Sequence, residues 1–195
     1  MENKKLSKDQ EELYRNLKKL FHTLREEMKK EHNRSTQITD LISDRWERAK
    51  FLGFGDQTSI YDESLVIGDV IVGAGCWIGP YTILDGSGGL NISDNVTVSS
   101  GVHIYTHDNI KKTLTSGLLD ISYKSVKIMN NVYIGANSII NKGVTIGQFS
   151  VVAANSFVNR DVLAHSIVGG TPAREIGRVV IDEGSVHLDY SKQIN

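Results

Sequence analysis

The stretch IMNNVYIGANSIINKGVTIGQFSVVAANSFV, residues 128–158, decides the fold. An aliphatic residue stands at every sixth position, and these residues are Ile128, Ile134, Ile140, Ile146, Val152 and Val158. A period of six matches neither the 3.6-residue period of a helix nor the two-residue alternation of a strand. It predicts a β-solenoid with triangular coils, in which each side of the triangle takes one hexapeptide and the aliphatic side chains stack along the axis.

The same period extends upstream of this stretch. It runs through Val66, Val72, Ile78 and Leu84, slips by two residues at 86–89, and resumes at Ile92, Val98 and Ile104. Gly or another small or polar residue often follows the aliphatic one, and we expect it at the corners because Gly and Asn tolerate a positive φ. A β-sandwich would instead show period two with irregularly spaced turns.

The first fifty residues have a different composition. They contain none of the 18 Gly and neither of the 2 Pro. The spacing of Leu13, Leu17, Leu20, Leu24 and Met28 predicts an amphipathic helix over residues 7–33, with Ser7 and Gln10 as a capping box. A second helical piece is expected from Ile38 to Lys50, after a break at residues 32–36.

The apolar stripe of the first helix has two interpretations. It forms a coiled coil or helical hairpin between chains, or it packs on its own domain. Three heptads are short for a coiled coil, which favours packing on its own domain. We therefore expect a helical segment over 1–52, a solenoid over 53–180 and a C-terminal tail over 181–195.

Composition excludes several classes of protein. A hydrophobic fraction of 39% is too high for general disorder, and a net charge of −1 argues against binding nucleic acid by phosphate neutralisation. No apolar run is long enough for a membrane span, and the charged N-terminus does not resemble a secretory signal. The single cysteine, Cys76, falls at an inward position and excludes a disulfide scaffold. We expect a cytoplasmic protein.

The repeated pattern of an aliphatic residue followed by Gly resembles the hexapeptide-repeat acyltransferase family over residues 56–180. The resemblance implies an all-β left-handed parallel β-helix, here with an N-terminal α-helical appendage, and a homotrimer with active sites between subunits. It also implies acetyl-CoA as co-substrate and no metal. The branch that it resembles contains the galactoside, maltose and xenobiotic acetyltransferases.

The repeat is interrupted at residues 105–125, where a loop must leave the coil at a corner, and long loops are commonly functional. In the branch named above, a catalytic His stands at the start of such a loop, which implies this role for His107. An imidazole can take the proton from a sugar hydroxyl as it attacks a thioester. Asp85 either binds sugar hydroxyls, orients His107 or only caps a bulge; Asp108 and Asn109 are further candidates for binding the acceptor.

His103 flanks an inward residue and is expected to point outward. It lines the same cleft as His107 or a subunit interface, or it joins His107 in a zinc site between subunits. The zinc interpretation lacks a third histidine with suitable placement in the coils. Because Cys76 points inward, an acyl-cysteine intermediate is not expected, and transfer should be direct.

The resemblance also implies the residues of the acyl-donor site. Tyr133 stands where many members have Trp along the pantetheine arm, and the backbone N–H near Ala136 is the candidate oxyanion donor. Ala154 lies in the stretch whose backbone binds the pantetheine amides. Arg160 is expected to meet the phosphates of coenzyme A, and Arg174, with Arg178, its 3′-phosphate.

These residues predict an acetyl-CoA-dependent O-acetyltransferase that acts on a sugar hydroxyl in polysaccharide or glycoside modification. One alternative is an N-acetyltransferase on a nucleotide-linked amino sugar, which usually carries a nucleotide-binding N-terminal domain. Another is a non-catalytic β-helix scaffold, which would lack the His, the loop and the Pro-Ala-Arg sequence at residues 172–174.

Overall fold

The computed structural model describes residues 6–190, and the chain divides into two compact units, Met1–Asp44 and Arg45–Asn195. The first unit holds α1 (Lys8–His32) and α2 (Ile38–Ile42). Ser7 and Gln10 form the predicted capping box, and Asn33 ends α1 in the left-handed conformation. The helix and its break are therefore confirmed, whereas the second helical piece is divided at residues 43–44 into α2 and α3 (Arg45–Phe51).

The apolar stripe of α1 is not buried in the first unit. No residue of α1 is buried, and Leu13, Leu17 and Leu20 are at least half exposed. Phe21, Leu24 and Met28 are partly buried, and α1 contacts α2. The first unit alone thus supplies no cover for the N-terminal part of the stripe, which the sequence predicted to pack on its own domain.

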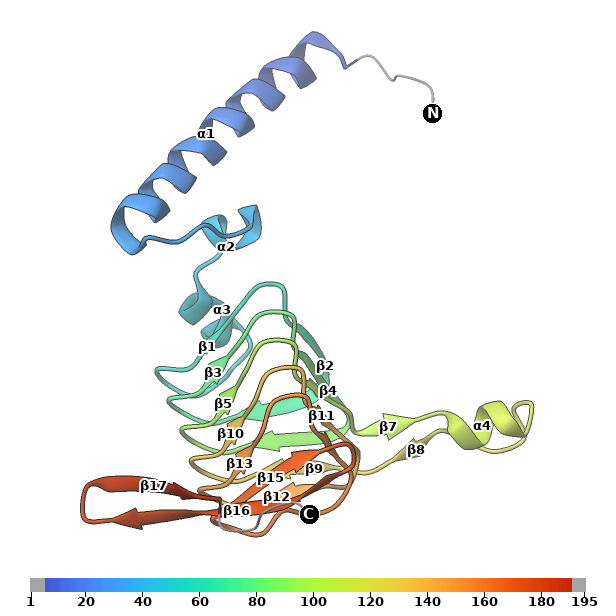
Figure 1. The fold of residues 1–195 in the computed structure, drawn as a ribbon. Helices are drawn as coiled ribbons and strands as arrows, with labels where there is room; N and C mark the ends of the chain where they lie inside the picture. Colours follow the sequence, from blue (N-terminus) through green and yellow to red (C-terminus); the bar gives the residue numbers. More distant parts are fainter. Residues whose placement is uncertain (1–5, 191–195) are drawn as a thin grey trace. The chain divides into compact units, whose positions relative to one another are not determined.

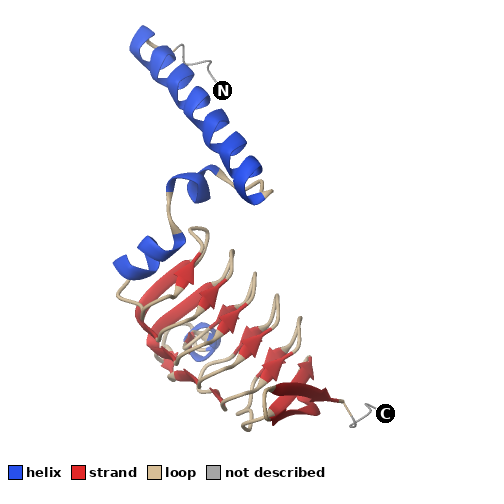
Figure 2. Ribbon diagram, turned by 90° about the vertical axis from the view of Figure 1, so that its left-hand side faces the viewer, coloured by secondary structure: helices blue, strands red, loops and turns tan. Residues whose placement is uncertain are grey.

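The second unit is a parallel β-helix with three faces per coil, which confirms the predicted solenoid (Figures 1 and 2). The first face consists of β1 (Ser59–Ile60), β3 (Trp77–Ile78), β5 (Thr97–Val98), β10 (Tyr133–Ile134), β13 (Val151–Val152) and β15 (Ser166–Gly170). The second face consists of the first halves of β2 (Leu65–Val72) and β4 (Ile83–Ile92), with β6 (His103–Ile104), β11 (Ile139–Ile140) and β14 (Phe157–Val158). The third face consists of the second halves of β2 and β4, with β9 (Val126–Ile128) and β12 (Thr145–Ile146).

The aliphatic residues of the repeat fill the interior. Register pairs each with its counterpart one coil on, for example Ile134 with Val98 and with Val152. Val66, in the first coil, is only partly buried, and the others are all buried: Val72, Ile78, Leu84, Ile92, Val98, Ile104, Ile128, Ile134, Ile140, Ile146, Val152 and Val158. Each coil therefore covers the apolar residues of its neighbours.

The glycines that directly follow an aliphatic residue have a different role from the one predicted, whereas Gly75, Gly101 and Gly143 do adopt the positive φ expected at corners. Gly135 directly follows Ile134, yet the positive φ falls two residues later, at Asn137 (58°). A Cβ on Gly135 would lie 2.5 Å from the backbone nitrogen of Ala154 in the next coil. Glycine is thus required directly after the aliphatic residue by the close approach of the coils, and the left-handed conformation falls two residues later, where Asn137 and its counterparts Gly75 and Gly101 stand.

Both ends of the solenoid are covered. At the first coil, Arg48 of α3 donates to the carbonyls of Tyr61 and Ser64 and lies 3.5 Å from a carboxylate oxygen of Asp62. At the last coil, β15 pairs with β16 (Ala173–Asp182), which forms an antiparallel hairpin with β17 (Ser185–Asp189). This C-terminal hairpin projects from the solenoid (Figure 1) and takes up residues 181–189 of the expected tail. Residues 191–195 of that tail lie outside the described residues.

Candidate active site

Two successive coils depart from regularity at the same corner, between the second and third faces. In one coil β4 contains two extra residues relative to β2 at residues 86–89, which is the predicted phase slip. In the next coil the chain leaves the solenoid at Tyr105 and returns at Ser125. Because Leu84 pairs with Ile104, Asp85 comes beside the start of this excursion.

The excursion has secondary structure of its own. His107 and Asp108 form β7 (His107–Asp108), which pairs in antiparallel fashion with β8 (Ser122–Tyr123), and α4 (Ile110–Leu114) lies beyond them. Figure 1 shows this loop projecting from the solenoid. The ring of Tyr123 lies 5.8 Å from that of His107. A short ribbon at its base therefore fixes the backbone of His107.

His107 and Asp85 are in direct contact. The Nδ1 atom of His107 lies 2.7 Å from Oδ2 of Asp85, although 22 residues separate them in the chain. The Asp85 carboxylate is 1% exposed, and the His107 side chain is 36% exposed. The imidazole thus has one nitrogen against a buried carboxylate while part of the ring is open to solvent.

Asp85 is held by a network of donors. Its carboxylate accepts from the Ser87 hydroxyl at 2.6 Å, the Thr106 amide at 2.8 Å and the Ser87 amide at 3.0 Å. The Thr106 hydroxyl donates to the Asp85 carbonyl at 2.8 Å and accepts from the Gly88 amide at 2.8 Å. Burial alone would raise the pKa of Asp85, but the hydrogen bonds from Ser87, Thr106 and His107 hold that pKa below its ordinary value.

This geometry determines which nitrogen of His107 can act on a ligand. An ionised carboxylate only accepts hydrogen bonds, so Nδ1 must carry the proton in the contact with Asp85. In a neutral imidazole Nε2 is then the acceptor. The pair can therefore remove a proton from a hydroxyl placed at Nε2, and the contact is the one that an orienting role for Asp85 requires.

Asp108 turns away from this pair to the next coil. Its carboxylate lies 2.7 Å from Nζ of Lys142, which also donates to the Ser122 carbonyl at 3.3 Å. The hydrogen bond from Lys142 lowers the pKa of Asp108 below its ordinary value. Lys142 thus ties both strands at the base of the loop to the solenoid, and Asn109 precedes α4 without a side-chain cap.

The residues assigned to the acyl donor lie in three places. Ala136 and Ala154 share the corner between the first and second faces, where the Asn155 amide donates to the Ala136 carbonyl at 2.9 Å. Arg160 and Arg174 line one pocket of about 210 Å³ beside the last coils, and Arg178 pairs with Glu175 at 3.0 Å.

Tyr133 lies apart from these residues. It is on the first face, 48% exposed, and lines a groove against the C-terminal hairpin. His107 lies at the start of the loop, which leaves the solenoid at the corner between the second and third faces. One protomer therefore brings together His107, Asp85 and the base of the loop, but not Tyr133.

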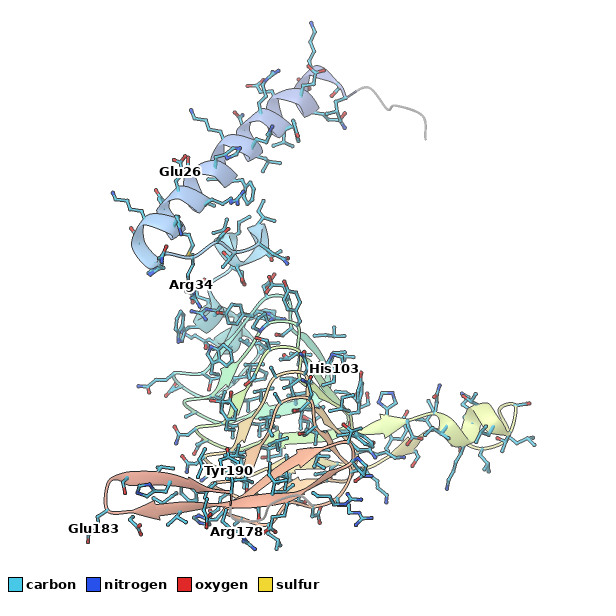
Figure 3. The ribbon with its side chains drawn as sticks, in the orientation of Figure 1. Glu26, Arg34, His103, Arg178, Glu183 and Tyr190 are labelled. Carbon is cyan, nitrogen blue, oxygen red and sulfur yellow. The ribbon has the colours of Figure 1, made fainter. Side chains whose placement is uncertain are left out.

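The structure also bears on the zinc site considered for His103 and on the chemistry of Cys76. His103 lies on the second face (Figure 3) with its Nδ1 3.3 Å from the Tyr105 hydroxyl. Among residues 6–190 no three His, Cys, Asp or Glu side chains are grouped as a metal site would need. Cys76 is buried, and burial raises the pKa of its thiol.

Sequence reasoning missed Ser87, Thr106 and Lys142. The signal for Ser87 and Thr106 was their position beside Asp85 and His107 at a corner shared by consecutive coils. Lys142 stands two residues after Ile140, which pairs with Ile104, so the register would have placed it below the loop. No helix in the described part of the chain is long and apolar enough to cross a membrane.

Known proteins resemble this chain in sequence. The model of the bacterial transferase hexapeptide family (six repeats) matches residues 125–160. Protein CapG of Staphylococcus aureus is 39% identical over 109 residues, which are 54% of this chain and 63% of CapG. Galactoside O-acetyltransferase of Escherichia coli is 34% identical over 98 residues, which are 46% of this chain and 48% of that enzyme. The chain therefore spans less than two thirds of the length of these relatives.

A solved structure resembles the chain over more of its length. The crystal structure of a hexapeptide-repeat-containing acetyltransferase from Vibrio cholerae superposes with a TM-score of 0.52 and 28% identity. It covers 82% of this chain and 92% of its own. The similarity thus extends beyond the repeats to most of both proteins.

Proposed function

Because the chain belongs to the bacterial hexapeptide-repeat transferases, we propose that it transfers an acetyl group from acetyl-CoA to a sugar hydroxyl, with His107 as general base. The observation that carries this proposal is the 2.7 Å contact between His107 Nδ1 and the buried Asp85 carboxylate. It leaves Nε2 of a partly exposed imidazole as the proton acceptor.

The proposed reaction is a direct transfer. Acetyl-CoA supplies the thioester, and the acceptor hydroxyl attacks its carbonyl while His107 Nε2 takes the hydroxyl proton. Asp85 stays ionised and holds the imidazolium that forms, as buried carboxylates do in other His-dependent acyl transfers. The Ala136 amide is the proposed donor to the oxyanion, and the thiolate of coenzyme A leaves with the proton that His107 returns.

The residues for coenzyme A fit the anionic end of that molecule. Arg160 and Arg174 come from different elements, yet both line the pocket beside the last coils. Two guanidinium groups facing one hollow are suited to phosphate. Since Tyr133 lies on a different part of the protomer from His107, we propose that the pantetheine arm meets Tyr133 of a neighbouring copy in a homotrimer.

The acceptor is proposed from the relatives. The name of the relative galactoside O-acetyltransferase indicates that the acceptor of that enzyme is a sugar hydroxyl. The same site also suits an amine, which carries its own lone pair and depends less on a base. A dependence of the rate on His107 therefore favours the hydroxyl acceptor over an amino sugar.

The test is release of thiol from acetyl-CoA in the presence of a panel of sugars and amino sugars. His107→Ala should reduce the rate by about 10²–10⁴-fold, the usual contribution of a general base. His22→Ala, in the other unit, is the matched control and should leave the rate unchanged. If His107→Ala leaves the rate of thiol release unchanged, His107 is not the general base. If the protein does not bind coenzyme A, the proposal that it is an acetyltransferase is refuted.

Two further variants separate positioning from binding. Asp85→Asn should lower kcat and shift the pH profile while leaving KM for acetyl-CoA unchanged, because Asp85 contacts only the imidazole and its own donors. Arg160→Ala should raise KM for acetyl-CoA with kcat unchanged. If Asp85→Asn instead raised KM for acetyl-CoA and Arg160→Ala instead lowered kcat, the assignment of both residues would be wrong.

A further inference from the structure

A hollow with concentrated positive charge, which we call the basic hollow, lies at the C-terminal end of α1, entirely within the first unit. Its volume is about 530 Å³. Four Lys or Arg side chains and one Glu line it, which gives a net charge of +3, although the whole chain has a net charge of −1. The acetyl transfer proposed above uses none of its residues, which are His22, Arg25, Glu26, Lys29, Lys30, Arg34 and Ser35.

The basic hollow is formed by one face of α1 and the segment that follows the helix. Its helical residues are spaced three and four apart, which places them on a single face, opposite the leucine stripe. Figure 3 labels Glu26 on the helix and Arg34 just beyond its end. The left-handed conformation of Asn33 (φ 50°) turns the chain at this point. Arg34 and Ser35 therefore complete the hollow beside the helix.

Two of these cations are held in place without being neutralised. The guanidinium of Arg25 lies 5.2 Å from the centre of the Phe21 ring, and Nζ of Lys29 donates to the side-chain oxygen of Asn33 at 2.6 Å. In the described part of the chain, none of Arg25, Lys29 and Lys30 forms an ion pair. A neutral ring and a neutral amide orient these charges and leave them available to an anion.

The position of these cations near the end of α1 does not by itself account for them. Cations are favourable there because the last carbonyls of a helix carry partial negative charge. In α1 the Asn33 amide already donates to the Lys29 carbonyl at 3.1 Å, and the Arg34 amide donates to the Met28 carbonyl at 3.5 Å. Arg25 and Lys29 stand four residues apart, a spacing at which like charges destabilise a helix. An anion in the basic hollow would offset this repulsion.

The chemistry of the lining favours phosphate over other anions. The guanidinium groups of Arg25 and Arg34 present paired N–H donors that match phosphate oxygens, and Lys29 and Lys30 add point charges. A pyrophosphate group carries more than one negative charge and therefore matches the net charge of the lining better than a single carboxylate does. The volume lies within the range of small-molecule sites, about 300–1,000 Å³, so it admits more than a bare anion.

We propose that the basic hollow binds the pyrophosphate group of a ligand. A soluble diphosphate ester and a lipid with a diphosphate headgroup present the same chemistry to it. The proposal is independent of the proposed function, in which the phosphates of coenzyme A are assigned to Arg160 and Arg174 of the second unit. It gives the first unit a binding role that the acetyl transfer does not require.

The test is calorimetric titration of the full chain with inorganic pyrophosphate. Arg25→Gln with Lys29→Gln should weaken binding by about 10-fold or more, because it removes two charge-assisted contacts from the basic hollow. Lys18→Gln with Lys19→Gln is the matched control, since it removes the same charge from the same helix outside the hollow, and it should leave binding nearly unchanged. Far-UV circular dichroism verifies that α1 is folded in both variants.

Equal weakening by the two pairs of substitutions would overturn the proposal, because it would show a non-specific attraction to the charge of α1. The absence of pyrophosphate binding by the unmodified chain at low salt would also overturn it.

Co-sedimentation with phosphatidylcholine vesicles that contain a polyprenyl diphosphate separates the two sources of the ligand. A lipid ligand predicts that the unmodified chain sediments with these vesicles and that the variant at Arg25 and Lys29 does not. A soluble ligand predicts binding in the titration with no sedimentation of either chain. Equal sedimentation of both chains would show that the vesicles are bound by a surface other than the basic hollow, and would overturn its role in lipid binding.

Discussion

The solenoid and helix α1 carry equally regular apolar patterns, but only one of the patterns is buried. Ile134 and its counterparts along the coils are buried, whereas Leu13, Leu17 and Leu20 of α1 are at least half exposed. The difference lies in what each pattern provides. A coil packs against the next copy of the same motif in its own chain, whereas a single helical stripe needs a surface that its own pattern does not contain.

The largest expected effect is in the buried column. Ile134→Ala should lower the free energy of unfolding by about 2–5 kcal/mol, because it removes a fully buried side chain and leaves a cavity between two coils. Denaturant unfolding measures this loss. Ile71→Ala, an exposed site on β2, is the control and should change stability by no more than about 0.5 kcal/mol. Equal losses at both sites would contradict the burial.

Asp85, a buried carboxylate of the solenoid, should give the next largest effect. Asp85→Asn should cost about 1.5–3 kcal/mol at pH 7, since it loses hydrogen bonds to a charged group. The folded-state pKa lies below the unfolded value of about 3.9, so this stabilisation is present above that pH and is lost as the pH falls through the folded-state value. The difference between wild type and variant in chemical unfolding should therefore shrink between pH 5 and pH 2. A difference that grows towards acid would contradict the assignment.

Substitutions at two corner positions distinguish a requirement for a small side chain from a requirement for a positive φ. Gly135→Ala should cost about 1–3 kcal/mol, because its Cβ would meet the Ala154 nitrogen. Asn137→Gly should cost less, since glycine readily adopts the positive φ found there. Thermal or denaturant unfolding measures both. A neutral Gly135→Ala would show that the coils can separate at this corner.

The smallest effect is expected on α1. Leu17→Ala should change stability by no more than about 0.5 kcal/mol if the stripe has no partner. A loss above about 2 kcal/mol that grows with protein concentration would show that a second copy covers the stripe. That outcome would bring α1 into the same class as the solenoid, with the covering surface in another chain.

Much of the site was predictable once the period was known. The period located the interruption at 105–125, and the resemblance to the acyltransferase family assigned the role of catalytic base to His107 at its start. Asp85 was singled out by the phase slip one coil earlier, but its three possible roles were left open. The network through Ser87 and Thr106, and the tie from Lys142 to Asp108, depend on distances that no spacing in the sequence contains.

The spatial arrangement of the acyl-donor residues could not be predicted from the repeat. Arg160 and Arg174 share a pocket because β16 turns back along β15, and the sequence signalled only that the coil ends there. The hairpin groove, which contains Tyr133, was not predicted. Residues 181–195 have no hexapeptide period, so the pattern that revealed the solenoid does not extend to β17.

The sequence by itself determined the solenoid, the order of its coils and the corner from which the loop leaves. It could do so because neighbouring coils are also neighbours in the chain, which makes burial a local property of the repeat. Only the tertiary structure decided that Asp85 contacts His107, that Lys142 ties down the loop, and that the loop and hairpin project from opposite sides of the solenoid. Those facts depend on the register between coils and on the directions in which irregular segments leave them, and neither follows from a period.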